Sequence, residues 1–144
     1  MEKFDALKLE NQICFPLYAA SREVVKRYRP FLDEINLTYT QYIVMMVLWE
    51  DKKISVKELG KKLYLDSGTL SPVLKSLEAK GFVTRERCMQ DERILIAEIT
   101  EAGMAVKAKA EGVPDEVARC VCLSADETKQ LYELLYKVLG GLDN

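Results

Sequence analysis

The sequence predicts a mainly α-helical fold that contains one small β-hairpin. Apolar residues recur every three or four positions over most of the 144-residue chain, which is typical of amphipathic helices. Capping sequences precede several of these stretches, and only the region around residues 82–99 has the alternation of two strands. Hydrophobic residues make up 49% of the chain, enough for the packed core of a single domain.

The N-terminal half is predicted to contain four helices. The first covers Leu7 to Tyr28, with Pro16 as a kink or break and Arg29-Pro30 as its end. A second, centrally buried helix begins at Thr38, which forms a T-x-x-Q capping box with Gln41. A short helix from 56 to 63 follows a Ser55 cap, and a fourth runs from an Asp66 or Ser67 cap to about Lys80, with Gly81 as its end.

The C-terminal half begins with the hairpin. Two β-rich runs, 82–87 and 94–99, are joined by the charged turn 89–93. Thr100 caps a long helix that Pro114 interrupts. Ser124 and Glu127 form another capping box, which begins a last helix that Gly140-Gly141 ends. Its apolar positions are expected to face inward; they are Leu131, Leu134, Leu135 and Val138.

Composition excludes several functions. The chain contains no histidine, which excludes His-based general bases, catalytic triads and His-ligated zinc or haem. No apolar run approaches the roughly 20 residues that span a bilayer, and the N-terminus has no apolar signal core. A cytoplasmic protein without membrane contact, metal or cofactor is expected. Its four cysteines are then thiols in the resting state.

Charge is distributed unevenly along the chain. Residues 52–93 carry ten basic and six acidic side chains, so this segment has a formal charge of +4 and the remainder −6. Two helices joined by a tight turn, followed by a basic hairpin, form a winged helix-turn-helix that suits the major groove of double-stranded DNA. A protein-contact module is the alternative. The predicted DNA-binding residues are Ser67, Thr69, Ser71, Pro72 and Lys75 on the second helix and Arg85, Arg87 and Arg93 on the wing.

The run from Asp66 to Gly81 resembles the recognition helix of the MarR family of winged-helix repressors. Asp91-Glu92-Arg93 and the later Thr100-Glu101-Ala102-Gly103 resemble that family's wing signature. The resemblance covers essentially the whole chain as one domain, with a DNA-binding core at about 35–100 and dimerisation helices at about 1–34 and 101–144. It implies a homodimer on a pseudo-palindromic operator, in which Arg93 enters the minor groove and Asp91 orients Arg93.

Three further segments resemble one particular branch of the MarR family. Residues 11–18 around Cys14, Tyr28-Arg29-Pro30, and residues 37–42 around Tyr39 are similar to the OhrR branch, the organic hydroperoxide sensors. The resemblance implies that Cys14 is the sensing thiol and that Tyr28 and Tyr39 hold it through their hydroxyls. The protein would then be a regulator rather than an enzyme, and an organic hydroperoxide would be its signal.

Cys120-Val121-Cys122 resembles the two-cysteine version of these sensors. That resemblance implies a disulfide between Cys14 and a C-terminal cysteine of the other subunit; either Cys120 or Cys122 is the candidate, with Cys120 preferred. Cys14 would first become a sulfenic acid and then a disulfide. Movement of the dimer helices would change the spacing of the two recognition helices and release the operator. Cys88 matches nothing in this pattern.

Three other hypotheses remain open from the sequence. The chain could be a repressor that senses a small aromatic ligand, with Tyr18, Tyr28, Tyr39 and Trp49 around a pocket. It could be a thiol peroxidase, although no arginine or threonine lies beside Cys14 in the sequence to polarise a peroxide. It could also hold a metal on thiolates of Cys14, Cys120 and Cys122, a weak metal pattern.

Overall fold

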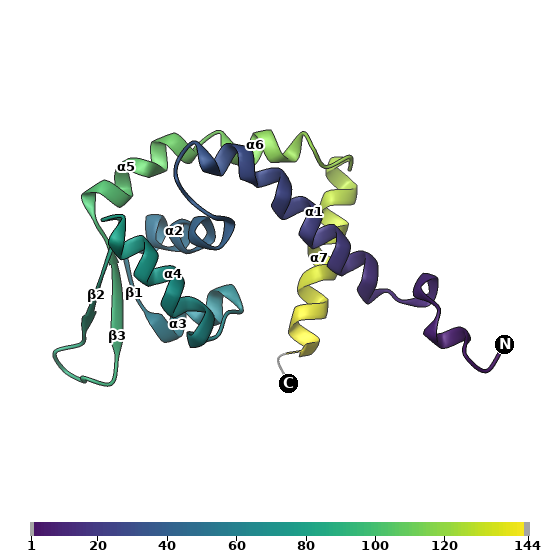
Figure 1. Ribbon diagram of the computed structural model, residues 1–144, viewed down its shortest axis with the longest axis horizontal. Coiled ribbons are helices and arrows are strands. Elements are labelled where there is room, and N and C mark those ends of the chain that lie inside the picture. Colours follow the sequence, from purple (N-terminus) through teal and green to yellow (C-terminus); the bar gives the residue numbers. More distant parts are fainter. Residues whose placement is uncertain (1, 143–144) are drawn as a thin grey trace.

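The structure is a computed structural model that describes residues 2–142. Two 3-10 turns, Asp5–Leu7 and Leu9–Asn11, come before the first helix. Most of the chain is helical, and three short strands form its sheet (Figure 1). The elements that follow are α1 (Cys14–Asp33), α2 (Tyr39–Asp51), β1 (Lys53–Ser55), α3 (Val56–Leu63), α4 (Ser67–Ala79), β2 (Val83–Arg87), β3 (Leu95–Ile99), α5 (Glu101–Ala110), α6 (Val113–Ala118) and α7 (Ala125–Leu142).

The predicted hairpin is confirmed, but it belongs to a sheet of three strands. β3 is the central strand, with β1 and β2 antiparallel on either side. Ala97 lies opposite Ile54 of β1 and opposite Arg85 of β2. β1 is not predictable from the sequence, because a strand of three residues is too short to show an alternating pattern. Its pairing with β3 depends on contacts over 40 residues away in the chain.

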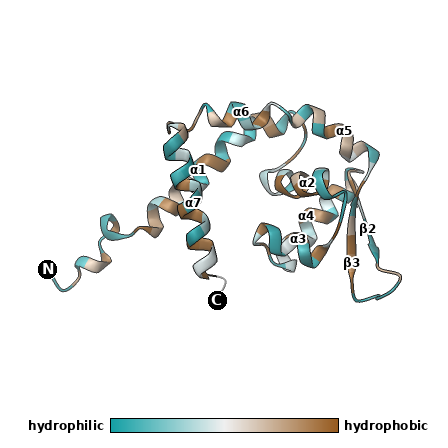
Figure 2. Ribbon diagram, turned by 180° about the vertical axis from the view of Figure 1, so that it is seen from behind, coloured by the Kyte–Doolittle hydropathy of each residue, from teal (hydrophilic) through white to brown (hydrophobic). Residues whose placement is uncertain are grey.

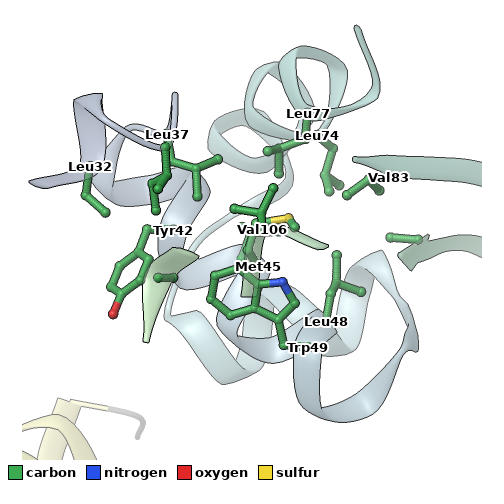
Figure 3. Packing of buried hydrophobic residues seen from close by; sticks show 14 of the residues in the cluster. Leu32, Leu37, Tyr42, Met45, Leu48, Trp49, Leu74, Leu77, Val83 and Val106 are labelled. Carbon is green, nitrogen blue, oxygen red and sulfur yellow. The ribbon is translucent and has the colours of Figure 1, made fainter. Parts of the chain in front are cut away.

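α2 is the centre of the hydrophobic core, as its continuous apolar sequence predicts. Its Val44, Met45 and Leu48 are fully buried, against leucines of α4 and Val83 of β2 (Figure 3). The indole Nε1 of Trp49 donates a hydrogen bond of 2.9 Å to the carbonyl oxygen of Gly103. The core therefore joins the helix-turn-helix to the beginning of α5. α4 covers one side of this core.

The predicted caps are confirmed at five helices, and at α3 the hydroxyl of Ser55 accepts from the backbone amide of Glu58 at 3.1 Å. Thr38 and Gln41 form both hydrogen bonds of the capping box at α2, and Ser124 and Glu127 form both at α7. At α4 the carboxylate of Asp66 accepts from the amide of Thr69 at 2.7 Å, which lowers the pKa of Asp66. Thr100 accepts from the amide of Gly103 at α5. These local bonds fix where each helix begins.

The first helix differs from its prediction at both ends. α1 begins at Cys14 rather than Leu7, so Pro16 lies in its first turn, where an amide is not needed for helical bonding. It also continues through Pro30 to Asp33, so Arg29-Pro30 does not end it. Burial of Leu32 and Ile35 against the core stabilises the additional turn beyond the proline.

The last helix also differs. α7 includes both Gly140 and Gly141 and extends to Leu142, so the glycine pair does not end it. Its apolar residues do not turn toward the core of this chain: Leu134 is 60% exposed, and no described residue of α7 is buried. Apolar segments of α7 and of the first half of α1 extend away from the core in Figure 2. No helix among residues 2–142 is long and apolar enough to cross a membrane.

Close packing in the helix-turn-helix predicts the effect of adding one methyl group. A Cβ on Gly60 of α3 would lie 2.6 Å from the carbonyl oxygen of Leu65, so Gly60→Ala must displace the turn before α4. We expect the free energy of unfolding to fall by about 1–3 kcal/mol. Urea denaturation measures this change. Gly112→Ala is the control, because no atom lies within 4 Å of its Cβ; equal losses in both variants would contradict the packing argument.

Candidate functional site

The outer face of α4 carries the residues that the sequence analysis assigned to DNA. Leu70, Leu74 and Leu77 are buried beneath it, which leaves the opposite face open. The predicted residues on that face are all exposed: Ser67, Thr69, Ser71, Pro72 and Lys75. Figure 1 shows α4 on the outside of the helix-turn-helix, with the β2–β3 hairpin extending beside it. The helix can therefore enter a groove without any rearrangement of the core.

At the wing, Arg93 is largely exposed and paired with one carboxylate. Its side chain is 90% exposed, and its Nε and Nη2 lie 3.0 and 3.1 Å from the two carboxylate oxygens of Asp91. The guanidinium of Arg93 lowers the pKa of Asp91 through these hydrogen bonds. The expectation that Asp91 orients Arg93 agrees with this paired geometry.

The other two arginines of the wing are held by the protein itself. Glu78 at the end of α4 accepts from both the backbone amide and the guanidinium of Arg85, which is mostly buried. Arg87 is exposed and donates to the carbonyl oxygen of Glu92 at 3.4 Å. Arg85 therefore fastens the wing to α4, and its predicted contact with DNA would require it to leave Glu78.

A groove of about 980 Å³ connects the wing to the start of α4. Lys57, Lys61 and Tyr64 line it and were not among the predicted DNA-binding residues. The basic pair Lys57 and Lys61, four residues apart on one face of α3, was a recognisable signal in the charge pattern. Tyr64 gave no such signal. The polar residues lining the groove include Lys57, Lys61, Tyr64, Ser67, Ser71 and Arg93.

Cys14 is the first residue of α1 and is exposed in the single chain. Ile13 before it provides no side-chain cap, so backbone amides of the first turn remain free. Free amides at a helix N-terminus favour negative charge nearby. The apolar neighbours of this thiol are open as well: Ile13, Phe15 and Leu17 are all exposed.

Tyr28 of α1 and Tyr39 of α2 lie together. Their ring centroids are 4.9 Å apart, and Tyr42 joins them at 5.8 Å from Tyr28. Burial raises the pKa of all three phenols, and for Tyr28 the neighbouring Tyr39 raises it further. The phenols therefore stay protonated at neutral pH and can donate hydrogen bonds. Tyr42, the third ring, was not singled out for this cluster from the sequence.

Cys14 is not part of this cluster within one chain. It lies fourteen residues before Tyr28 on the same continuous helix, which places the two about 21 Å apart along the axis. A thiol needs direct contact to accept a hydrogen bond from a phenol. The three predicted residues can therefore meet only if the tyrosines come from another chain.

The other cysteines lie in two different places. Cys120 follows α6, with its Sγ 3.6 Å from the carbonyl oxygen of Glu116, and Cys122 lies in the segment before the Ser124 cap. Both are exposed. Cys88 follows β2, and its thiol donates to the side-chain oxygen of Gln90 at 3.0 Å. All four cysteines are free thiols in this structure.

Three of the four residues of the aromatic-ligand hypothesis adjoin Tyr42, whose ring centroid lies 5.8 Å from that of Tyr28 and 6.3 Å from those of Tyr39 and Trp49. Trp49 lines a hollow of about 400 Å³ with Tyr42 and Met46, between α2 and the α5–α6 region. Tyr18 lies ten residues before Tyr28 on α1. Within the described residues 2–142, the lining of this hollow includes neither Tyr18 nor Tyr28 nor Tyr39. Likewise, no group of three or more Cys, Asp or Glu residues in the described part is placed to hold a metal ion.

Known transcriptional regulators share this architecture. The family model described as transcriptional regulator SarA/Rot matches residues 26–110. The organic hydroperoxide resistance transcriptional regulator of Bacillus subtilis (strain 168) is 47% identical over 140 residues, which cover 97% of this chain and 95% of that protein. A mutant MarR from E. coli, solved with operator DNA, shares the fold with a TM-score of 0.78 and 24% identity, over 96% of this chain and 99% of its own.

AbfR is a structural relative that has been solved in several states. Overoxidised AbfR bound to DNA has a TM-score of 0.78 and 37% identity, covering 98% of this chain and 99% of its own. Reduced AbfR bound to DNA has a TM-score of 0.77, whereas the disulfide form has a TM-score of 0.62 at the same 37% identity. The present chain therefore has an arrangement closer to the DNA-bound forms of AbfR than to its disulfide form.

Proposed function

The chain belongs to the SarA/Rot family of transcriptional regulators and has the MarR-type winged-helix fold, and from this premise we propose that it is a DNA-binding repressor that organic hydroperoxides inactivate through Cys14. The observation that carries the proposal is the separation of Cys14 from Tyr28 along α1, with Tyr39 of α2 beside Tyr28, in a chain whose outer helices have open apolar faces. An antiparallel second copy would bring the two parts together. The similarity to the Bacillus subtilis hydroperoxide regulator supports the choice of signal.

The DNA-binding form is a homodimer. α1 and α7 both present apolar side chains to the outside, and such faces on a soluble chain indicate a protein partner. Residues of about 1–34 and 101–144 form the dimer, and the core of about 35–100 holds α4 and the wing. Two copies of α4 would then enter successive major grooves of a pseudo-palindromic operator, about one helical turn apart.

Contacts with the operator divide between α4 and the wing. Ser67, Thr69 and Ser71 have short side chains that can approach base edges, while Lys75 can neutralise a phosphate. Arg93, presented by Asp91, reaches the minor groove, where arginine is favoured by the negative potential. Because Lys57 and Lys61 line the same groove as Arg93, we include them as further phosphate contacts.

Replacing Arg93 tests the wing. Arg93→Ala should weaken operator binding by about 1–3 kcal/mol, because it removes an exposed cation without a role in the core. Fluorescence anisotropy with a labelled operator measures the affinity, and gel filtration checks the dimer. Arg119→Ala is a matched control, since Arg119 is also exposed and paired with a carboxylate, that of Glu116, but lies after α6. Equal affinities of both variants would remove the wing from the mechanism.

The sensing site is assembled between the two subunits. Tyr28 and Tyr39 of one subunit would donate their hydroxyl hydrogen bonds to the Cys14 sulfur of the other, because neither can reach the cysteine of its own chain. The thiolate attacks the O–O bond of the hydroperoxide: the sulfur gains one oxygen as sulfenic acid, and the other leaves as an alcohol after taking a proton. The exposed apolar residues beside Cys14 would favour an alkyl hydroperoxide over hydrogen peroxide.

Disulfide formation then follows. The thiol of Cys120 or Cys122 in the other subunit attacks the sulfenic acid of Cys14, which forms the S–S bond and releases water. The AbfR structures support this step as the one that changes the molecule. Reduced and overoxidised AbfR were both solved on DNA, and the disulfide form resembles the present chain least of these three.

Loss of the sensing thiol should separate binding from response. Cys14→Ser should bind the operator like the wild type and stay bound after addition of cumene hydroperoxide, whereas the wild type is released. Tyr28→Phe and Tyr39→Phe should each oxidise more slowly, because each removes a donor to the sulfur. Anisotropy of the labelled operator follows all four proteins. A normal hydroperoxide response in Cys14→Ser would end the redox hypothesis and favour the repressor that senses an aromatic ligand.

The resolving cysteine can be identified from cross-linking. Oxidised wild type should run as a covalent dimer on a non-reducing gel, and one of the single variants Cys120→Ser and Cys122→Ser should lose that band. The variant that loses it should accumulate sulfenic acid at Cys14, detected with a dimedone probe. If oxidised wild type releases DNA but stays monomeric on the gel, the protein works with one cysteine, and the resolving role of both residues is wrong.

A further inference from the structure

Gln41 is the one buried polar residue among the described core side chains, and it is hydrogen-bonded on both sides of its amide. Its side-chain oxygen accepts from the backbone amide of Thr38 at 3.0 Å and from the ammonium of Lys80 at 2.8 Å. Its side-chain nitrogen donates to the hydroxyl of Ser76 at 2.9 Å. Only 5% of Gln41 is exposed, so water does not replace these partners readily.

These bonds connect two elements that have separate tasks in the proposed function. Gln41 and Thr38 form the cap of α2, whose first turn also holds Tyr39 and Tyr42 of the aromatic cluster. Ser76 and Lys80 lie four residues apart, so they share one side of α4 near its C-terminal end. The opposite end of α4 presents Ser67 and Ser71 to the groove. The amide of Gln41 is thus bound by the recognition helix and by the tyrosine-bearing turn at once.

Apolar contacts between α2 and α4 do not fix their relative position in the same way. Leu70, Leu74 and Leu77 pack against the core through forces that have little directional preference. An amide that has partners on both sides is satisfied in one geometry only, and a small displacement leaves buried polar groups unpaired at a cost. Burial also lowers the pKa of the Lys80 ammonium, so this charge depends on its few acceptors. Displacement of the α2 cap should therefore carry the end of α4 with it.

We propose that Gln41 is a positioning residue that transmits a displacement of the Tyr28–Tyr39 cluster to the recognition helix, so that it couples the state of Cys14 to operator affinity. This inference rests on the proposed function, since it needs a redox-dependent movement at the tyrosines. Gln41 contacts neither the sensing thiol nor the DNA-facing surface. It acts through the α2 cap on one side and through Ser76 and Lys80 on the other.

The test measures the coupling and not the binding alone. For each protein, the operator dissociation constant is determined in the reduced and in the hydroperoxide-treated state, and the rate of Cys14 oxidation is measured separately. Gln41→Met keeps the length of the side chain but removes all three hydrogen bonds. We expect Cys14 to oxidise at the wild-type rate and the ratio of oxidised to reduced dissociation constants to fall by about fivefold or more.

Two further variants make the result specific. Ser76→Ala removes only the hydrogen bond between Gln41 and Ser76 and leaves the α2 cap intact. It should therefore lower the ratio of oxidised to reduced dissociation constants by a smaller factor. This variant serves as the test if Gln41→Met does not fold. Lys62→Met is the control, because it breaks a tie of 2.7 Å between Asp51 at the other end of α2 and α3; its ratio should equal that of the wild type.

The outcomes separate this inference from the function on which it rests. A wild-type ratio in both Gln41→Met and Ser76→Ala overturns the coupling role. A slower oxidation of Cys14 with an unchanged ratio also overturns it, because Gln41 would then act on the sensing chemistry. If wild-type protein itself shows equal affinities in both states, the proposed redox function has failed and the relay has nothing to transmit.

Discussion

The length and continuity of α1 constrain everything else in this molecule. Cys14 begins the helix and Tyr28 lies fourteen residues later, so one unbroken helix holds the thiol and the phenol of Tyr28 about 21 Å apart. The helix has apolar side chains on the outside along its first half, where the chain gives them no partner. A second copy in the opposite direction would cover these side chains and place each cysteine beside the tyrosines of its partner. In this account, dimerisation and sensing depend on the same surface.

The second requirement is a mechanical connection from that surface to the DNA. The tyrosine cluster is formed where α1 passes the first turn of α2, and α2 is also the helix on which the core and α4 are built. A change at the tyrosines therefore occurs next to the first turn of α2, the central helix of the DNA-binding unit. The hydrogen bonds of Gln41 to Ser76 and Lys80 provide a directional link at this point, whereas the leucines of α4 supply most of the apolar contact.

Local signals in the sequence predicted much of this fold. The caps at Thr38, Asp66, Thr100 and Ser124 depend on residues three positions apart, so they are visible without any knowledge of the tertiary structure. The exposed face of α4 followed from helical periodicity in the same way. These features were confirmed because their causes lie within a few residues of each other in the chain.

The errors have non-local causes. α1 continues through Pro30 because the core buries Leu32 beyond it, and β1 exists because β3 pairs with it. The bonds of Gln41 to α4 span 35 and 39 residues, a distance at which no pattern in one sequence indicates contact. By contrast, the separation of Cys14 from Tyr28 could have been counted from the helix prediction itself. That count already shows that Cys14 cannot contact Tyr28 of its own chain.

The most direct measurement is the oxidation rate of Cys14 in a mixed dimer. One subunit carries Cys14→Ser, the other carries Tyr28→Phe with Tyr39→Phe, and two different affinity tags isolate the pair. If the site forms between subunits, the single Cys14 faces the intact tyrosines of its partner, and it should react with cumene hydroperoxide at the wild-type rate. If that Cys14 reacts as slowly as it does in the homodimer with both phenylalanines, the site lies within one subunit and the account is contradicted.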